Sequence, residues 1–552
     1  MTAPPGTRRR VAVIGAGPCG LVALKELLER GHDAIAFDPR ERIGGTFTRT
    51  RPEMALTTNN VSTAFGAMPD PSGAGARFWT SGEYLGYLNA YADRFGLRSR
   101  IRLGAKVTEV RRAGGDAWEV AFHSPSEVDG DARSSTEVGR FDCVGTATGF
   151  AAEPVHPELP GQGDFAGEIV HSSDLRDQRQ LEGRRVLVIG LGESGSDIAL
   201  LAGRLGAASA VSTRSGAGYV IPRRYRGLPA DRDTNRCYHA IPRWLVRTQA
   251  MRFKTRIEEL MLGPGDDRAL VNRIRELNEL RGISPFQRFA TKTEGFVEAM
   301  LVHGTEYKPG LARLERDRAV FEDGTSFRCD LVALCTGYRP AFPFLASTEP
   351  AIAADAKVAR GLYKHMLHPD VGPGLAWIGY VRPGIGNIPA CAEMQARYLA
   401  LLLSGERRLP SAEEMRRDIA LNSARDQEQF PVDAERLGGL TDYMRFMEGV
   451  AGLIGCRPSL PRLALRDPRT AAKAFFGPLG GSQYRLRGPG ADPDVRAAIR
   501  AAPTMPWPVL AYELLFYLAG RLLAPLGDRW STRLWRRPRP WAARARPERA
   551  TT

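Results

Sequence analysis

Three glycines and one acidic residue near the N-terminus have the types and the spacing needed to bind a dinucleotide. Gly15, Gly17 and Gly20 stand between an apolar run and an amphipathic stretch, and a second apolar run ends in Asp38. The glycines allow a tight turn, close approach of the backbone to a pyrophosphate, and close packing of helix on strand. A carboxylate at the end of the second run can accept hydrogen bonds from ribose hydroxyls. The elements that must position these residues are a strand, a helix and a second strand within residues 11–38.

The same pattern recurs farther along the chain, but the second copy ends in a basic residue. Gly190, Gly192 and Gly195 again follow an apolar run and precede a helical stretch, and the next apolar run ends in Thr213 and Arg214. A carboxylate at that place would repel a 2′-phosphate, whereas a guanidinium can hold it with bidentate hydrogen bonds. We therefore predict a free ribose in the first unit and NADP(H) in the second. The alternative for Arg214 is a solvated side chain at a strand end.

A polar cluster lies between the two units. Thr58, Asn59 and Asn60 follow a Gly44-Gly45 turn in a segment with little regular pattern. Threonine and asparagine cap helices and bend chains, so the local chemistry alone favours a turn. A cluster of ligand-binding residues is the alternative.

Composition and charge narrow the class of protein. The chain has 552 residues, 43% hydrophobic and 25% charged, which indicates two or three globular domains. Much of the net charge of +15 lies at the ends, in 8–10 and in eight arginines within 529–549, which fits a membrane surface or solubility better than a nucleic-acid groove. Seven cysteines without a C-x-x-C pair argue against a metal site or a disulfide framework. The N-terminus shows no signal peptide, so we expect a cytoplasmic location.

The C-terminal part carries an apolar segment that needs its own interpretation. Residues 507–526 are long enough to span a bilayer, but the segment contains Glu513 and Arg521 and is bracketed by Pro508 and Pro525. Aromatic residues and the arginine-rich tail fit a helix anchored at a membrane interface. A helix that docks on a soluble protein is the alternative.

Taken together, these motifs resemble the flavin-containing monooxygenases of the class B flavoprotein type over nearly the whole chain. The resemblance is carried by GAGPCG, IGGTF, the Thr58-Asn59 pair, GLGESGSDIA, LCTGYRPAFPFL and CRPSLPRLALRDP with YRLRGPG. The family fingerprint F-x-G-x-x-x-H-x-x-x-(F/Y) begins at Phe165 and contains His171, but Leu175 stands in the last aromatic position. We interpret His171 as a structural link between two domains. The C-terminal part is most similar to the membrane-associated animal-type, dimethylaniline N-oxide-forming members.

The resemblance implies the cofactors and the residues that hold them. For FAD and NADPH we expect contacts from both glycine turns, the two strand ends and the polar cluster: Gly15, Ala16, Gly17, Pro18, Cys19, Gly20, Asp38, Gly45, Thr46, Phe47, Thr58, Asn59, Asn60, Gly190, Gly192, Ser194, Gly195, Ser196, Asp197, Thr213 and Arg214. Asp38 replaces the usual glutamate, and Thr46-Phe47 replaces the usual Leu-Trp. The resemblance also makes Asn59 the catalytic candidate, because an amide can donate and accept hydrogen bonds at once.

The implied fold is α/β, with two Rossmann-like dinucleotide-binding domains, a helical insertion and a helical C-terminal extension. The expected ranges are 1–155 plus 338–410 for FAD, 156–337 for NADP with an insertion at 216–305, an extension at 411–505, the apolar helix at 507–526 and a basic tail at 527–552. We expect the insertion to cover a site.

The implied activity is NADPH- and O2-dependent oxygenation of a soft nucleophile, an amine nitrogen or a sulfide, through a C4a-hydroperoxyflavin. The alternatives are a Baeyer–Villiger ketone monooxygenase, an NADPH oxidase and a flavin-binding redox partner without turnover. We expect a small-molecule substrate and O2 as partners, no nucleic acid and no metal. Peripheral contact with the cytoplasmic face of a membrane and a homo-oligomer are both compatible with the sequence.

Overall fold

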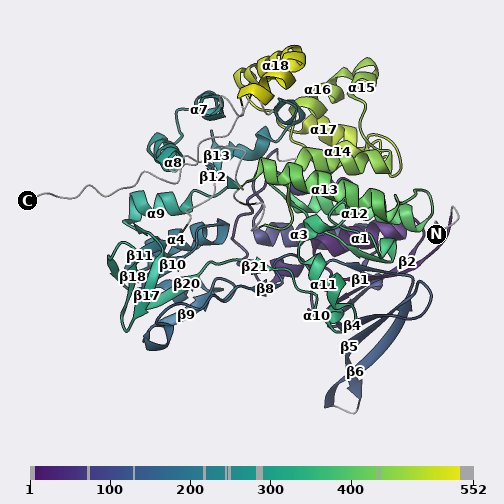
Figure 1. The fold of residues 1–552 in the computed structure, drawn as a ribbon, viewed down its shortest axis with the longest axis horizontal. Coiled ribbons are helices and arrows are strands. Elements are labelled where there is room, and N and C mark those ends of the chain that lie inside the picture. Colours follow the sequence, from purple (N-terminus) through teal and green to yellow (C-terminus); the bar gives the residue numbers. More distant parts are fainter. Residues whose placement is uncertain are drawn as a thin grey trace, which may run out of the picture.

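Two five-stranded parallel sheets carry the two glycine units (Figure 1). The computed structural model describes residues 6–70, 75–128, 131–214, 219–242, 245, 250–280, 290–431, 433 and 437–534. In strand order, the first sheet consists of β22 (Leu375–Trp377), β7 (Cys143–Thr146), β1 (Arg10–Ile14), β2 (Asp33–Asp38) and β3 (Ile101–Leu103). The second consists of β16 (Glu306–Lys308), β11 (Ala208–Ser212), β10 (Arg185–Ile189), β20 (Leu331–Leu334) and β9 (Glu168–His171). The predicted α/β fold with two Rossmann-like units is confirmed.

The two units follow the same plan. Each central strand leads through its glycine turn into a helix, α1 (Pro18–Glu29) or α4 (Glu193–Leu205), and then into the neighbouring parallel strand. A three-stranded antiparallel sheet precedes the return strand in both units. These sheets are formed by β4 (Lys106–Arg112), β5 (Trp118–Val128) and β6 (Asp131–Phe141), and by β17 (Leu311–Glu315), β18 (Arg318–Phe321) and β19 (Ser326–Arg328).

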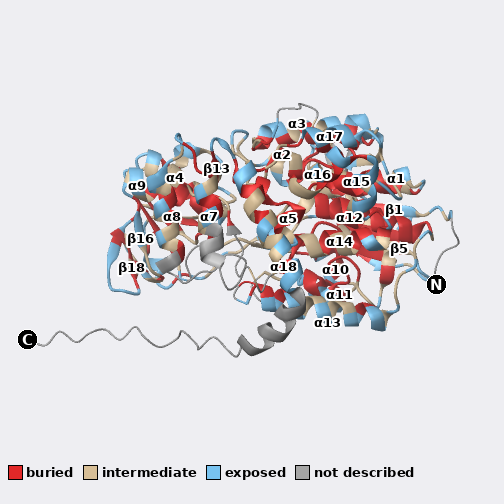
Figure 2. Cartoon of the chain, turned by 90° about the horizontal axis from the view of Figure 1, so that it is seen from above, coloured by how far each residue is buried: buried red, intermediate tan, exposed pale blue. Residues whose placement is uncertain are grey.

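Helices cover the sheets because the strands are apolar on both faces. Residues 11–14 of β1 and residues 143–146 of β7 are buried throughout, as is typical of parallel strands between two layers. α1 packs against α12 (Ile388–Leu403), and α4 packs against α9 (Gly295–His303). Figure 2 shows the buried residues of β1, α12 and α14 (Tyr443–Ile454) gathered in the larger lobe.

α12 begins earlier than the sequence pattern suggested. The apolar pattern of the sequence predicts a helix over 393–404, but the helix starts at Ile388 because Asn387 caps it. The Asn387 side chain accepts a hydrogen bond from the backbone N of Ala390 (2.8 Å), and Pro389 lies in the first turn, where a proline is tolerated.

The chain crosses between the two units twice, and the two crossings pair with each other. β8 (Glu153–Pro154) and β21 (Tyr338–Arg339) form a short antiparallel ribbon. His171 lies against this ribbon. Its Nε2 is 3.2 Å from the carbonyl oxygen of Gly337, its Nδ1 accepts from the backbone N of Ser173 (3.1 Å), and its ring contacts Tyr338 edge to face. Burial lowers the pKa of His171, so a neutral side chain fits this place.

The insertion is mainly helical in its described residues and also contains four short strands. Within 216–305 the structure has α5 (Arg236–His239), α7 (Ala250–Met261), α8 (Arg268–Leu280) and α9, together with the short strands β12 (Tyr219–Val220), β13 (Arg224–Tyr225), β14 (Leu228–Pro229) and β15 (Ala290–Thr291). The sequence pattern predicts a helix over 244–262; of this range, 244 and 246–249 lie outside the described residues and α7 covers most of the rest. The strand pair β12·β15 brings the two ends of the insertion together.

The C-terminal extension is helical, as the sequence indicated. Elsewhere in the chain lie α2 (Asn60–Thr63), α3 (Ser81–Arg94), α10 (Pro343–Ala346), α11 (Pro350–Ala356), and β23 (Arg382–Pro383) paired with β24 (Leu440–Thr441). The extension itself comprises α13 (Ala412–Gln429), α14, α15 (Leu460–Arg466), α16 (Pro468–Phe476), α17 (Val495–Ala501) and α18 (Trp507–Leu534).

α18 packs on the insertion through one face. Val509 and Leu510 join a buried apolar cluster with Ile257 and Met261 of α7. Glu513 is fully buried and accepts a hydrogen bond from Asn235 Nδ2 (3.1 Å). No helix among the described residues combines the length and the apolar character that crossing a bilayer requires. Residues 535–552, most of the predicted basic tail, lie outside the described residues.

Candidate functional site

The first glycine turn has the shape of a phosphate cradle. Gly15 has φ +114°, and a Cβ there would lie 2.6 Å from the carbonyl oxygen of Ala147. A Cβ on Gly20 would lie 1.9 Å from the carbonyl oxygen of Gly15, so only glycine lets α1 start this close to the strand. Gly17 is the N-cap of α1 and offers no side chain to the first-turn N–H groups. These donors are therefore available to an anion.

The neighbouring predicted residues line the same turn. A Cβ on Gly45 would lie 2.9 Å from Cα of Gly17, so the two loops touch through their backbones. Phe47, in the short 3-10 helix Gly45–Thr48, packs edge to face on Tyr84 with the ring centroids 4.8 Å apart. Burial raises the pKa of the Cys19 thiol to about 12, so this cysteine stays protonated.

Asp38 closes the cradle at the end of β2. Its Oδ2 accepts from the backbone N of Ala16 (2.8 Å), its Oδ1 accepts from the backbone N of Arg40 (2.9 Å), and the side chain is almost completely buried. Each carboxylate oxygen can accept a further hydrogen bond. The carboxylate thus lies next to the glycine turn, where the sequence predicts a ribose.

The second glycine turn repeats this geometry. Gly190 has φ +97°, and a Cβ there would lie 2.6 Å from the carbonyl oxygen of Cys335. A Cβ on Gly195 would lie 2.2 Å from the carbonyl oxygen of Gly190. Gly192 is the N-cap of α4, again without a side-chain cap, and Ser194 is exposed in the first turn. The start of α4 therefore presents free N–H donors to a second anion.

Two residues predicted to contact NADP(H) also join α4 to the start of α9 and to the residues just before it. Ser196 Oγ donates to the carbonyl oxygen of Thr293 (3.0 Å) and accepts from the backbone N of Phe296 (2.9 Å). Asp197 Oδ1 accepts from Thr293 Oγ1 (3.1 Å). Arg214 is exposed at the end of β11, directly after Thr213.

Asn59 lies between the two units and is fully buried. It is the N-cap of α2, where its Oδ1 accepts from the backbone N of Ser62 (3.0 Å). The turn that local chemistry favoured is therefore present. The side chain of Asn59 faces the Asp231 carboxylate, but its amide Nδ2 makes no close hydrogen bond among the described residues, so this buried donor can turn to a ligand. Asn60 differs, because its Nδ2 donates to Asp70 and to the carbonyl oxygen of Gly75.

The insertion places an acid and a base against this cluster. The backbone N of Asn59 donates to Asp231 Oδ2 (2.9 Å). Lys292 Nζ is 3.4 Å from both Thr58 Oγ1 and the carbonyl oxygen of Gly386, and its backbone N donates to Glu193 Oε1 (2.9 Å). Lys292 thus connects both glycine units with the loop before α12. Sequence reasoning missed Asp231 and Lys292, since no motif surrounds them.

Several buried polar atoms at this junction lack partners among the described residues. They are Asn59 Nδ2, Asp231 Oδ1, Glu193 Oε2, and Nε and Nη2 of Arg223. Burial raises the pKa of Asp231 and outweighs the opposing effect of Lys292, and burial raises the pKa of Glu193 to about 7. A native protein keeps such a group of unsatisfied atoms only where a ligand or water completes it.

A profile of one family, described as FMO-like, flavin-binding monooxygenase-like, matches residues 8–505. The chain belongs to this family. Its members bind FAD and depend on NADPH, so this flavin monooxygenase uses both cofactors. The two glycine cradles and the unsatisfied atoms between them fit that pair of dinucleotides.

Similar proteins include a brominase and a flavin-containing monooxygenase. The chain is 32% identical to a decarboxylating 4-hydroxybenzoate brominase of Pseudoalteromonas luteoviolacea, over 87% of this chain and 90% of that protein. It is 30% identical to flavin-containing monooxygenase 5 of Rattus norvegicus, over 88% of this chain and 90% of that protein.

Solved structures share the fold. An S-allyl-L-cysteine S-oxygenase from Allium sativum superimposes with a TM-score of 0.57 at 21% identity, covering 90% of this chain and 98% of that one. A cyclohexanone monooxygenase bound to epsilon-caprolactone superimposes with a TM-score of 0.57 at 18% identity, covering 84% of this chain and 98% of that one. The fold therefore accommodates more than one oxygenation chemistry.

Proposed function

We propose that this flavin monooxygenase oxygenates soft nucleophiles, an amine nitrogen or a sulfide sulfur, with NADPH and O2. The observation that carries the proposal is the buried, unpartnered Nδ2 of Asn59 at the junction of the two cradles. A neutral amide donor in a closed site can fix a reacting oxygen without supplying a proton. Bound FAD would accept hydride from NADPH and activate O2.

The chain's own residues bind, orient and exclude water. The first-turn N–H groups of α1 and Asp38 would hold FAD, and those of α4 together with Arg214 would hold NADPH. Asn59 would orient the reacting group, and Asp231 holds the backbone of Asn59 in place. Complete burial of Asn59 keeps bulk water away from its amide.

Phenol bromination is the second candidate. The 32% identity to the brominase suggests it, and Lys292 is the specific observation in its favour. Among the described residues its ammonium makes two long hydrogen bonds of 3.4 Å, one of them to Thr58, and it lies near the carboxyl groups of Asp231 and Glu193; a cation held this loosely can attract a halide. Baeyer–Villiger oxidation and uncoupled NADPH oxidation remain alternatives. Leu175, in the last position of the fingerprint, argues weakly against Baeyer–Villiger oxidation.

One experiment separates these activities. Purified, FAD-loaded enzyme is given NADPH, O2 and, in parallel, a tertiary amine, a sulfide, a cyclic ketone, or 4-hydroxybenzoate with bromide. Product and H2O2 are measured against NADPH consumed. N-oxide or sulfoxide near one per NADPH supports the proposal. A lactone as the main product would show Baeyer–Villiger oxidation instead, and a bromophenol would show phenol bromination. H2O2 without any other product would indicate an NADPH oxidase.

We also propose that α18 rests on a membrane interface through its outer face. Leu515 is 61% exposed and Leu522 is 78% exposed, and Leu518 and Trp507 lie on the same side of the helix. Apolar side chains that face away from the protein are typical of interfacial helices. The domain ranges given above and a homo-oligomeric state stay predictions.

A further inference from the structure

Glu513 is an acid buried in the docking face of α18, where its neighbours are apolar. Val509, Leu510 and Gly520 lie on the same face at helical spacing, and all three are buried. A Cβ on Gly520 would lie 2.3 Å from Cδ of Pro242, so the helix lies close against the insertion. Figure 2 shows α18 beside α5. An apolar side chain would dock this helix at lower cost than a buried carboxyl group, so packing alone does not account for Glu513.

Glu513 binds the segment of the insertion that carries Asp231. Its Oε2 accepts a hydrogen bond from Asn235 Nδ2 over 3.1 Å. The other end of this amide, Asn235 Oδ1, caps α5 by accepting from the backbone N of Tyr238 over 2.8 Å. Both ends of the Asn235 side chain are thus used, which fixes its orientation. Asn235 is fully buried, so bulk water does not compete for either bond.

Residues 231–235, which we call the strut, are braced by their own hydrogen bonds. The backbone N of Thr234 donates to the carbonyl oxygen of Asp231 (3.2 Å), and the backbone N of Asn235 donates to the carbonyl oxygen of Asp233 (2.7 Å). Every residue of the strut is buried. Because energetic coupling runs through such packed and hydrogen-bonded chains, a shift of Asn235 would also move Asp231.

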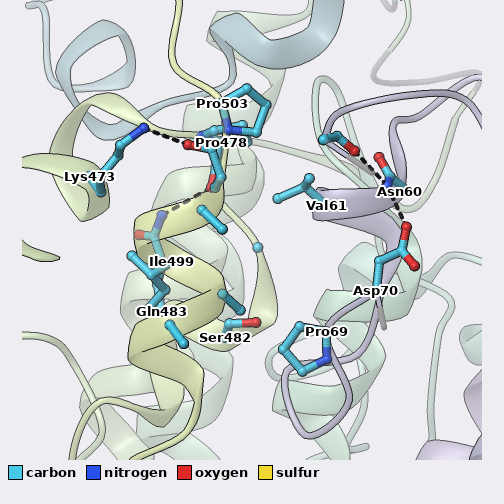
Figure 3. Close-up of a pocket in the computed structure, with 16 residues that line it drawn as sticks. Asn60, Val61, Pro69, Asp70, Lys473, Pro478, Ser482, Gln483, Ile499 and Pro503 are labelled. Carbon is cyan, nitrogen blue, oxygen red and sulfur yellow. Dashed lines mark hydrogen bonds between the residues drawn. The ribbon is translucent and has the colours of Figure 1, made fainter. Parts of the chain in front are cut away.

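The other end of the strut holds the loop of Asn59. Asp231 Oδ2 accepts from the backbone N of Asn59 over 2.9 Å. Figure 3 shows the helix that follows this loop: Val61 of α2 faces Pro478 and Gln483 of the C-terminal extension across a cavity of about 260 Å³. Because the cavity separates these walls, α2 is packed less tightly on this side than a filled core would pack it. The position of Asn59 therefore depends more strongly on its bond to Asp231.

From these contacts we infer that Glu513 is a positioning residue for oxygenation: through Asn235 and the strut it holds Asp231, and thereby Asn59, in place. The inference rests on the proposed role of Asn59 and adds a residue of α18 to those on which that role depends. The docked α18 is then a condition for coupling NADPH oxidation to oxygen transfer.

Hydrogen exchange of backbone amides tests the strut without any turnover. Glu513→Leu removes the acceptor but keeps an apolar docking face, so FAD content and the Kd of NADP⁺ should stay near wild type. The backbone amide of Asn59, which donates to Asp231, should exchange about tenfold faster or more. Glu513→Gln keeps an oxygen acceptor for Asn235 and should restore slow exchange. Leu510→Ala, which removes a buried apolar contact of α18 with the insertion, is the matched control and should leave exchange at Asn59 unchanged.

Coupling is measured with FAD-loaded enzyme, NADPH, O2 and thioanisole. In Glu513→Leu, sulfoxide per NADPH should fall several-fold while H2O2 rises, and Glu513→Gln should recover the yield. Because Glu513 acts through Asp231, the double variant Glu513→Leu/Asp231→Ala should couple no worse than Asp231→Ala alone. Asn235→Ser keeps a cap for α5 but does not reach Glu513. It should therefore reproduce the effect of Glu513→Leu, and it takes its place if that variant fails to fold.

The outcomes separate the inference from the proposed function. Unchanged exchange at Asn59 in Glu513→Leu and Asn235→Ser would overturn the inference, and so would an equal effect of Leu510→Ala, because Glu513 would then only dock α18. Faster exchange with unchanged coupling would overturn it as well, since oxygenation would not need the position that the strut gives. An enzyme that forms neither sulfoxide nor N-oxide would overturn the proposed function, and the exchange rates would still show whether Glu513 holds Asn59 in place.

Discussion

The backbone N–H of Asn59 donates a hydrogen bond to Oδ2 of Asp231 over 2.9 Å, and the two residues are 172 positions apart in the chain. One belongs to the loop after the flavin cradle and the other to the insertion. Both are buried, so the contact holds the proposed catalytic loop against the insertion inside the protein.

Removing the Asp231 carboxylate should shift the loop that carries Asn59 while leaving the Asn59 amide in the protein. Asp231→Ala leaves a buried N–H unpaired, which costs about 1–3 kcal/mol, and we expect the loop to shift. FAD content should stay near wild type, while product per NADPH falls several-fold and H2O2 rises. Asp231→Asn keeps an acceptor and should restore most of the coupling. Unchanged coupling in Asp231→Ala would refute the positioning role.

Asn59 itself should be required for oxygenation but not for flavin binding. Asn59→Asp replaces the amide donor with a carboxylate that faces Asp231 in a buried site. We expect normal FAD content, continued NADPH oxidation and almost no oxygenated product. Product yield is measured against NADPH consumed. A yield of N-oxide like that of the wild type would rule out a catalytic role.

Arg214 should discriminate NADPH from NADH. Arg214→Ala removes the guanidinium at the end of β11, so binding of NADP⁺ should weaken about 10- to 100-fold while NAD⁺ binding changes little. Calorimetry with both nucleotides measures this. Arg204→Ala, which removes another exposed arginine of the same unit, serves as the control. Equal weakening of both nucleotides would contradict the 2′-phosphate assignment.

Glu193 should make NADP⁺ binding depend on pH. Burial raises its pKa to about 7, so the carboxyl at the start of α4 is neutral below that pH and charged above it. A charged carboxylate would repel the cofactor phosphates. The ratio of the wild-type Kd to the Kd of Glu193→Gln should therefore rise between pH 6 and pH 8.

The same pKa shift has a consequence for stability. Because the folded-state pKa lies above the ordinary value of 4.5, the folded protein holds this proton more tightly. The free energy of unfolding of the wild type relative to Glu193→Gln should fall as pH rises from about 4.5 to about 7 and stay level above. Chemical denaturation of both proteins measures it, and a flat difference would show that Glu193 titrates normally.

The outer face of α18 should govern membrane binding. Replacing Leu515, Leu518 and Leu522 together by Gln leaves the buried face intact, so the melting temperature should stay unchanged. Sedimentation with vesicles that contain anionic lipid should show lost binding. Leu465→Gln, at an exposed leucine of α15, is the control. If the triple variant still binds vesicles, the contact lies elsewhere.

A feature could be predicted from the sequence when the residues that form it lie close together in the chain. The glycine turns at Gly15 and Gly190 are set by neighbours within a few residues, so spacing alone indicated both cradles and the α/β fold. Asp231 and Lys292 reach Asn59 and Thr58 only through tertiary packing, and no local pattern marks them. For the same reason, the contact between Glu513 and Asn235 could not be read from the chain.

The ribbon of β8 and β21 has a mechanical consequence. Both passages of the chain between the flavin unit and the NADPH unit run through this one pair of short strands, with His171 packed against it. Any rotation of one unit relative to the other would have to bend the same few residues. Such a rotation would also part Asn59 from Asp231, whereas the backbone contacts of each glycine cradle lie within one unit.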